Sequence, residues 1–340
     1  MSVSQVVILL RSAMRHAYPR GEAGRVNSMK RQSIGGYLLL GAIALALILA
    51  NSPLDGLYRG FADNSGLRTI ALALFFLNVG LELRHEVRDG ILRKPRLAVV
   101  PIFAAVTGMI VPAGIFLLFN IGRATAAGWP TVISFDVAFA LAVLSIAGRW
   151  LPRQLRAFVL SIAVVDDSLA IVVLALVFAG SFNPTALVSL AALALGLLVP
   201  GLHRLRPALD PAVNLLALPL FGFLSAGVAF GSIAGSLDGY LMISIAVAIL
   251  VGKPLGSLGG TFIATKSKLG SLDAAITWPL LRRVAPIFAM CFTVSILMSQ
   301  LAFANDDALH ASANLAVVIV ACAMALVSSL YLWRGKKLHG

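Results

Sequence analysis

The chain has 340 residues, of which 59% are hydrophobic and only 12% are charged, and its formal net charge is +13. Soluble proteins average about 25% charged residues, so this composition excludes a soluble globular domain and indicates a polytopic helical membrane protein. The basic residues gather in short loops between apolar runs. The positive charge is therefore a sign of membrane topology and does not indicate a nucleic-acid partner.

Ten apolar runs approach the length of about 20 residues that a helix needs to cross a bilayer. They predict an all-α protein with a single transmembrane domain over residues 33–333. The expected spans are 33–52, 66–82, 98–120, 130–148, 156–179, 185–200, 212–231, 240–263, 284–304 and 312–333.

The distribution of basic residues predicts the orientation of these spans. If the N-terminus lies inside, every inner loop carries Lys or Arg, whereas the outer loops hold only Arg59, Arg68 and Arg123. Basic loops stay on the cytoplasmic side of a membrane. We therefore expect a multi-pass protein of a bacterial cytoplasmic (inner) membrane, with a basic cytoplasmic arm at 1–32 and a cytoplasmic tail at 334–340.

A small set of charged residues lies within the apolar runs, and its members are Asp136, Asp166, Asp167 and Lys253. One charge at the centre of a bilayer costs roughly 2.5–3.5 kcal/mol on insertion scales, and intramembrane acids commonly mark ion or proton paths. Adjacent helical residues point about 100° apart, so Asp166 and Asp167 are expected to face different partners. The alternative is an aspartate pair that only pins neighbouring helices.

Lys253 directly precedes Pro254, in the middle of an apolar run. A buried lysine is stabilised by a nearby carboxylate, so we expect Lys253 to pair with one of the intramembrane acids. The alternative is a kinked helix whose lysine extends to the membrane boundary. Glu82 and Glu86, at the inner end of the second span, are expected to be solvated charges. Neither a cofactor nor a metal site is expected.

Seven short motifs follow one another along the chain in a fixed order. They are V-G-L-E (79–82), G-M-I-V-P-A (108–113), D-V-A-F-A-L (136–141), V-V-D-D (164–167), L-P-L-F (218–221), G-K-P-L-G (252–256) and F-T-V-S-I (292–296). In this order they resemble the NhaA-type sodium/proton antiporter family, from about residue 34 to residue 333 with one gap.

The resemblance implies a fold with an inverted repeat. Its two three-helix units are 98–179 and 240–333, and 33–97 and 180–239 supply the panel or interface helices. Each unit contains a helix that is broken at the membrane midplane, and the two broken helices cross near Phe135 and Thr293. Two spans that are usual in the family are missing between about 179 and 211.

The resemblance also implies roles for the buried charges. Asp167 matches the principal sodium ligand, and Asp166 matches the acid that pairs with the lysine, here Lys253. Asp136 and Lys253 would balance the partial charges of the half-helix ends. Sodium (or lithium) ions and protons would compete for the aspartates. The protein would be an antiporter without enzymatic activity, with the lipid bilayer around it and a homodimer as the assembly usual for the family.

The departures from the family pattern keep other functions open. Phe135 stands where the family usually has threonine, so one oxygen ligand is lost and a different cation is conceivable. The missing spans leave open a degenerate paralogue that does not transport and acts as a membrane partner. An intramembrane aspartyl protease also uses two acids, but adjacent aspartates and the absence of a G-x-G-D motif disfavour that chemistry.

Overall fold

The computed structural model describes residues 20–89, 91–137, 140, 143–144, 151–177, 184–228 and 236–339, and these residues contain helices and no strand. The α-helices are α2 (Arg20–Ala50), α3 (Asp55–Ala62), α4 (Ser65–Asp89), α5 (Pro95–Phe119), α7 (Arg153–Val177), α8 (Pro184–Leu198), α9 (Arg206–Ala212), α10 (Leu218–Ala226), α12 (Gly239–Val247), α13 (Lys253–Lys266), α14 (Trp278–Val284), α15 (Thr293–Ala302) and α16 (Asp307–His339). The 3-10 segments are η1 (Ile91–Arg93), η2 (Ala124–Val132), η4 (Leu202–Leu205) and η7 (Ala285–Ala289), and the π-helical segments are η5 (Val213–Ala217) and η6 (Ala248–Gly252).

Six helical stretches of the described chain are long and apolar enough to cross a membrane, which makes the protein polytopic. A seventh is formed if the bent pair Trp278–Ala289 and Thr293–Ala302, with 43° between its halves, is one span. Two further apolar helices, Ile34–Ala50 and Leu187–Leu198, are shorter. The expected span at 130–148 starts with the end of the 3-10 segment η2 and then has no regular structure over residues 134–136, and much of its remainder lies outside the described residues.

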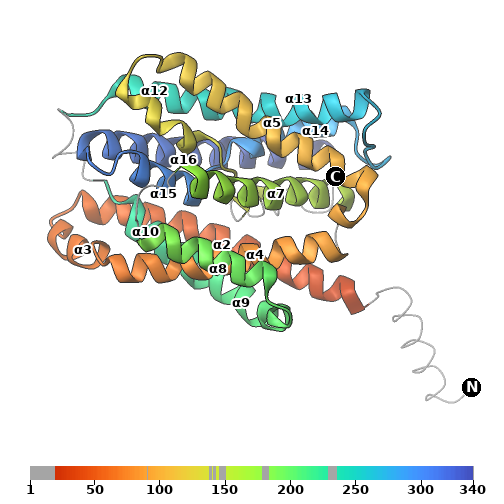
Figure 1. The fold of residues 1–340 in the computed structure, drawn as a ribbon, viewed down its shortest axis with the longest axis horizontal. Coiled ribbons are helices and arrows are strands. Elements are labelled where there is room, and N and C mark those ends of the chain that lie inside the picture. The colour runs from red at the N-terminus through yellow and green to blue at the C-terminus, as the bar shows by residue number, and fades with distance from the viewer. Residues whose placement is uncertain are drawn as a thin grey trace, which may run out of the picture.

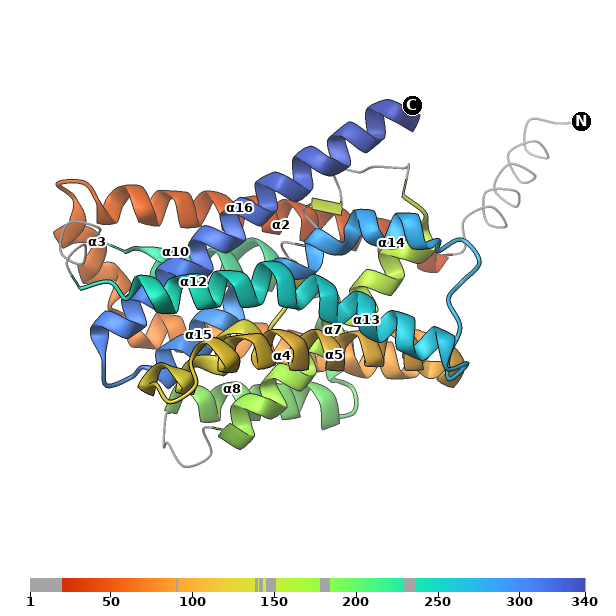
Figure 2. The same ribbon diagram turned by 90° about the horizontal axis from the view of Figure 1, so that it is seen from above.

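The helices lie roughly parallel in the view of Figure 1, whereas Figure 2 shows that α16 and α7 run diagonally across the others. In Figure 1, α2, α4, α8 and α10 form one group, α5, α12 and α13 form another on the opposite side, and α7, α15 and α16 lie between them. The start of α2 and the end of α16 lie at the same end of the bundle. α2 begins at Arg20, within the arm expected at 1–32.

The contact between α13 and α5 depends on small residues. Gly252, Gly256 and Gly260 recur every four residues and form one stripe along the helix. A Cβ atom at Gly256 would collide with the backbone of Thr107, and the Thr107 hydroxyl donates a 2.6 Å hydrogen bond to the Gly256 carbonyl. Small residues at such spacing let membrane helices approach closely, and van der Waals packing then holds them together.

A second close helix contact joins α4 and α8. Gly80 of α4 and Gly196 of α8 face each other, and a Cβ atom on either would overlap the backbone of the other helix. Arg84 is buried and its Nη1 donates to the carbonyl of Leu197 at 2.7 Å, which satisfies one of the free carbonyls at the end of α8. α8 packs far more extensively on α4 than on α7, so it belongs to the group of α2, α4 and α10.

The two π-helical segments each lie just before a proline. η5 precedes Pro219 and η6 precedes Pro254. Proline lacks the N–H of a helix hydrogen bond and its ring crowds the preceding turn, and a wider turn relieves that clash. The helix continues from Gly239 to Lys266 as one span, and Lys253 lies in its middle, 1% exposed. Its side chain therefore does not extend to a membrane boundary, and the boundary alternative is wrong.

Candidate ion-binding site

Two interruptions of helical structure meet at the centre of the bundle. The chain is not helical at residues 134–136, after η2, and at residues 290–292, between η7 and α15. The N–H of Asp136 donates a 2.8 Å hydrogen bond to the carbonyl of Met290, and the hydroxyls of Ser134 and Ser295 lie 2.9 Å apart. Two stretches far apart in the sequence thus satisfy each other's polar groups where the helices are broken, as backbone in a membrane must.

Asp136 caps the helix that starts at the second interruption. Thr293 is the first residue of α15, and its hydroxyl and backbone N–H donate to one carboxylate oxygen of Asp136 at 2.7 Å and 3.3 Å. The N-terminal end of a helix carries a partial positive charge, which favours an acid at that position. Asp136, 6% exposed, therefore neutralises the start of α15.

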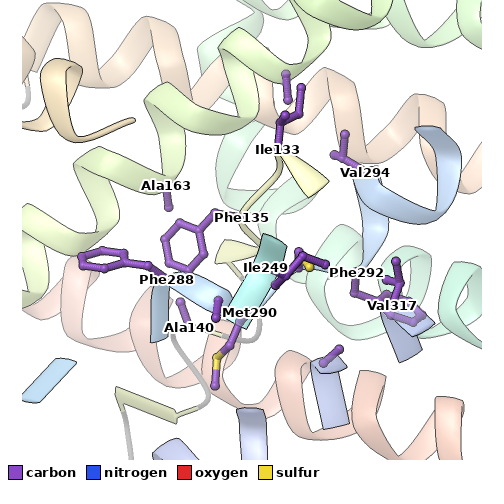
Figure 3. Packing of buried hydrophobic residues seen from close by; sticks show 14 of the residues in the cluster. Ile133, Phe135, Ala140, Ala163, Ile249, Phe288, Met290, Phe292, Val294 and Val317 are labelled. Carbon is purple, nitrogen blue, oxygen red and sulfur yellow. The ribbon is translucent and has the colours of Figure 1, made fainter. Parts of the chain in front are cut away.

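Phe135 contributes its backbone to the site and turns its ring away. The ring packs edge-on against Phe288, with 5.7 Å between ring centroids, and Figure 3 shows it beside Ala163 in the apolar core. The backbone of Phe135 lies beside Asp166 and stabilises its carboxylate. At this position the protein therefore supplies a backbone donor and no side-chain oxygen.

Asp166 and Lys253 form a fully buried ion pair. Lys253 Nζ, from α13, lies 2.8 Å from Asp166 Oδ1, from α7, and both residues are 1% exposed. This partner is the one that the resemblance implies for Lys253. Desolvation makes such a pair costly to form and more costly to break, because the remaining charge would be buried alone.

Asp167, next to Asp166 on α7, faces in another direction. It is 2% exposed, and its carboxylate has no hydrogen bond or ion pair among the described residues. It lines a cavity of about 20 Å³, which is room for one water-sized particle. The opposite wall comes from α4, η5 and α10 and consists of Phe75, Asn78, Val79, Glu82, Val213, Asn214 and Leu218, with Val137 beside Asp167.

Glu82 is part of this cavity, so the expectation of a solvated charge was wrong. Its side chain is 12% exposed, and Oε1 lies 3.8 Å from Nη2 of Arg206, whose Nε lies 3.5 Å from Asp210. α9 brings Arg206 and Asp210 close to Glu82 in the C-terminal part of α4, a contact between distant segments that no local pattern indicates. Glu86 is half-buried and accepts a 2.9 Å hydrogen bond from Ser161, so it is not freely solvated either.

The described residues contain no group of three or more His, Cys, Asp or Glu side chains placed to hold a metal ion together. The acids instead divide into separate environments. Asp136 caps a helix, Asp166 pairs with a lysine, and Asp167 faces the cavity. Of the three aspartates in the core, Asp167 has the carboxylate that is open to a small monovalent ion or a proton.

Comparison with known proteins agrees with this architecture. The family model described as Na+/H+ antiporter 1 matches residues 26–201 and 199–332. The chain belongs to this family. Similar relatives within it include the Na(+)/H(+) antiporter NhaA of Shewanella sp. (strain W3-18-1) and that of Shewanella putrefaciens (strain CN-32). Each is 34% identical over 389 residues, which cover 92% of this chain and 97% of the relative.

The same comparison shows where this family member is shorter. The two matched pieces meet at 199–201, and an alignment of 389 residues exceeds the 340 residues of the chain. A stretch of the relatives therefore has no counterpart here. The meeting point lies within the interval 179–211, where the resemblance implies two missing spans, and it coincides with the turn between α8 and η4.

Proposed function

We propose that this protein exchanges sodium ions for protons across a bacterial inner membrane, with Asp167 as the residue that binds either one. The observation that carries the proposal is the buried Asp167 carboxylate, which faces the cavity and has no partner among the described residues. Membership of the antiporter family and the names of the relatives support the assignment of sodium and protons.

Charge balance in the core gives the physical reason for exchange. Lys253 compensates Asp166, and the N-terminus of α15 compensates Asp136. Asp167 has no such compensation, so a negative carboxylate in this apolar setting is stabilised only when a cation or a proton joins it. One carboxylate in a small cavity accepts one of the two at a time. Sodium binding therefore releases a proton, and protonation releases sodium.

Transport also requires that the site open alternately to each side of the membrane. We propose that the units 98–179 and 240–333 form an inverted repeat within ten spans, with both termini in the cytoplasm. The crossing of residues 134–136 with 290–292 and the glycine contact of α5 with α13 would hold these units together. They would move as one body against the group of α2, α4, α8 and α10. Asp167, at the boundary between the two groups, would then change its exposure.

The geometry does not favour proteolysis. An aspartyl protease activates water between two facing carboxylates, whereas Asp166 is engaged by Lys253 and Asp167 faces a cavity on another side of the same helix. Two alternatives remain within the family: the protein could transport a different cation, or it could be a member that does not transport. The experiment that tests the proposal separates them.

The experiment measures proton movement on addition of sodium to vesicles that contain the purified protein. The wild-type protein is expected to release protons on sodium addition, and Asp167→Asn is expected to abolish this response while the protein remains inserted. Asp55→Asn is a matched control, because Asp55 is an acid paired with Arg59 on the surface. Full exchange by Asp167→Asn would refute the site. A wild-type protein inert to sodium, lithium and potassium would identify a member that does not transport.

A further inference from the structure

The wall opposite Asp167 carries a second oxygen that has no partner. Asn78 of α4 is 5% exposed and lines the same cavity as Asp167. Its Oδ1 atom is buried, and no hydrogen-bond donor lies within reach among the described residues. A buried carbonyl oxygen without a donor is costly, so its retention at this place calls for a ligand.

The neighbours of Asn78 fix the direction of its amide group. Its side chain lies beside Asp210 and stabilises the Asp210 carboxylate. An ionised carboxylate only accepts hydrogen bonds, so the NH2 group of Asn78 must be the donor and Oδ1 must be the free end. Asp210 is held in turn by Arg206 at 3.5 Å. The chain Arg206–Asp210–Asn78 therefore orients a neutral oxygen on the cavity wall.

We propose that Asn78 Oδ1 is a ligand of the cation that binds at Asp167. The proposal rests on the function proposed above and adds a residue that determines specificity. Hard cations are bound by several oxygens, of which carboxylates and side-chain carbonyls are common examples. Phe135, on the neighbouring segment, turns a ring of carbon atoms into the core and offers none. Asn78 supplies the neutral oxygen from the opposite wall.

A neutral oxygen acts unequally on the two competing ions. The amide oxygen of Asn78 does not itself take up a proton at physiological pH, so it coordinates sodium directly, whereas it offers the protonated site only one hydrogen bond from the Asp167 carboxyl. Asn78 would therefore set how much sodium is needed to displace the proton from Asp167. Because Asn78 lies on α4 and Asp167 on α7, the cation would bind fully only when the two helices face each other as they do here.

The test compares the sodium dependence of exchange in wild-type protein and in Asn78→Leu, which keeps the size of the side chain and removes the oxygen. The apparent KM for sodium is expected to rise about tenfold, with the maximal rate changed less than about twofold. Asn78→Ser places a hydroxyl oxygen on a shorter side chain, and this variant is expected to recover part of the affinity for sodium. Ser225→Ala is the matched control, because its buried hydroxyl also lacks a partner but does not line the cavity.

Direct titration of the detergent-solubilised protein with sodium chloride gives a second measurement that does not depend on transport. An unchanged KM and unchanged sodium affinity in Asn78→Leu would overturn the proposal and leave a water molecule as the only partner of Oδ1. A lower melting temperature without a change in KM would also overturn it, because the role would then be structural. A wild-type protein that binds sodium without exchanging it would refute only the proposed function, and the titration would still decide the role of Asn78. If the wild-type protein does not bind sodium either, both proposals fall.

Discussion

Removal of the lysine from the buried ion pair gives the sharpest test of the core. In Lys253→Ala, Asp166 would lose the cation that balances its charge, with Oδ1 losing its partner at 2.8 Å and Oδ2 already lacking one among the described residues. Breaking a buried pair from one side typically costs about 3–5 kcal/mol. Since both residues are 1% exposed, solvent does little to reduce that cost.

The assay is thermal unfolding of the purified protein in detergent. The cost is expected to lower the melting temperature of Lys253→Ala by on the order of 5 °C or more. The double variant Lys253→Ala with Asp166→Asn removes the unpaired charge and is expected to recover most of the loss, since neutral replacements of buried pairs are often tolerated. Lys266→Ala is the matched control, because Lys266 is an exposed lysine at the end of the same helix. An unchanged melting temperature in Lys253→Ala, or a double variant as unstable as the single one, would refute the pairing argument.

Two further substitutions test the packing around the site. Gly256→Leu is expected to force α13 away from Thr107 of α5 at a cost of about 3 kcal/mol and to abolish exchange, whereas Gly259→Leu, where a Cβ atom meets nothing within 4 Å, is expected to be tolerated in both unfolding and vesicle assays. Thr293→Val removes the 2.7 Å hydrogen bond to Asp136 and is expected to cost about 1–3 kcal/mol in unfolding measurements, with Thr293→Ser retaining the wild-type stability. Equal stability of the valine and serine variants would show that the hydroxyl bond from residue 293 to Asp136 does not stabilise the protein.

Features that depend on a single stretch of sequence could be predicted from the sequence. Apolar runs indicate membrane helices because each run is long enough by itself to cross the bilayer. Charges within those runs stand out because hydrocarbon makes them costly, so Asp166, Asp167 and Lys253 could be recognised as buried charges that need a partner or a ligand. The pairing of Lys253 with Asp166 followed from the resemblance to the family, since composition alone left either acid available.

The features that were missed depend on contacts between distant segments. Glu82 was expected in solvent, but α9 covers it with Arg206, whose position is set by the turn after α8. Asn78 was overlooked because a neutral amide in an apolar run is a weak signal. One local sign was present, because Asn78 precedes Glu82 by four residues and the two therefore lie on one face of α4.

The close contact between Gly80 and Gly196 has a bearing on how small such a protein can become. This contact and the hydrogen bond from Arg84 pack α8 directly against α4. The position of α8 therefore does not depend on further helices beside it. The chain is shorter than its relatives at the turn that follows α8. The wall that faces Asp167 is built from α4, η5 and α10, all of which are retained. Evolution could therefore shorten this protein at a peripheral turn while its ionic centre stayed whole.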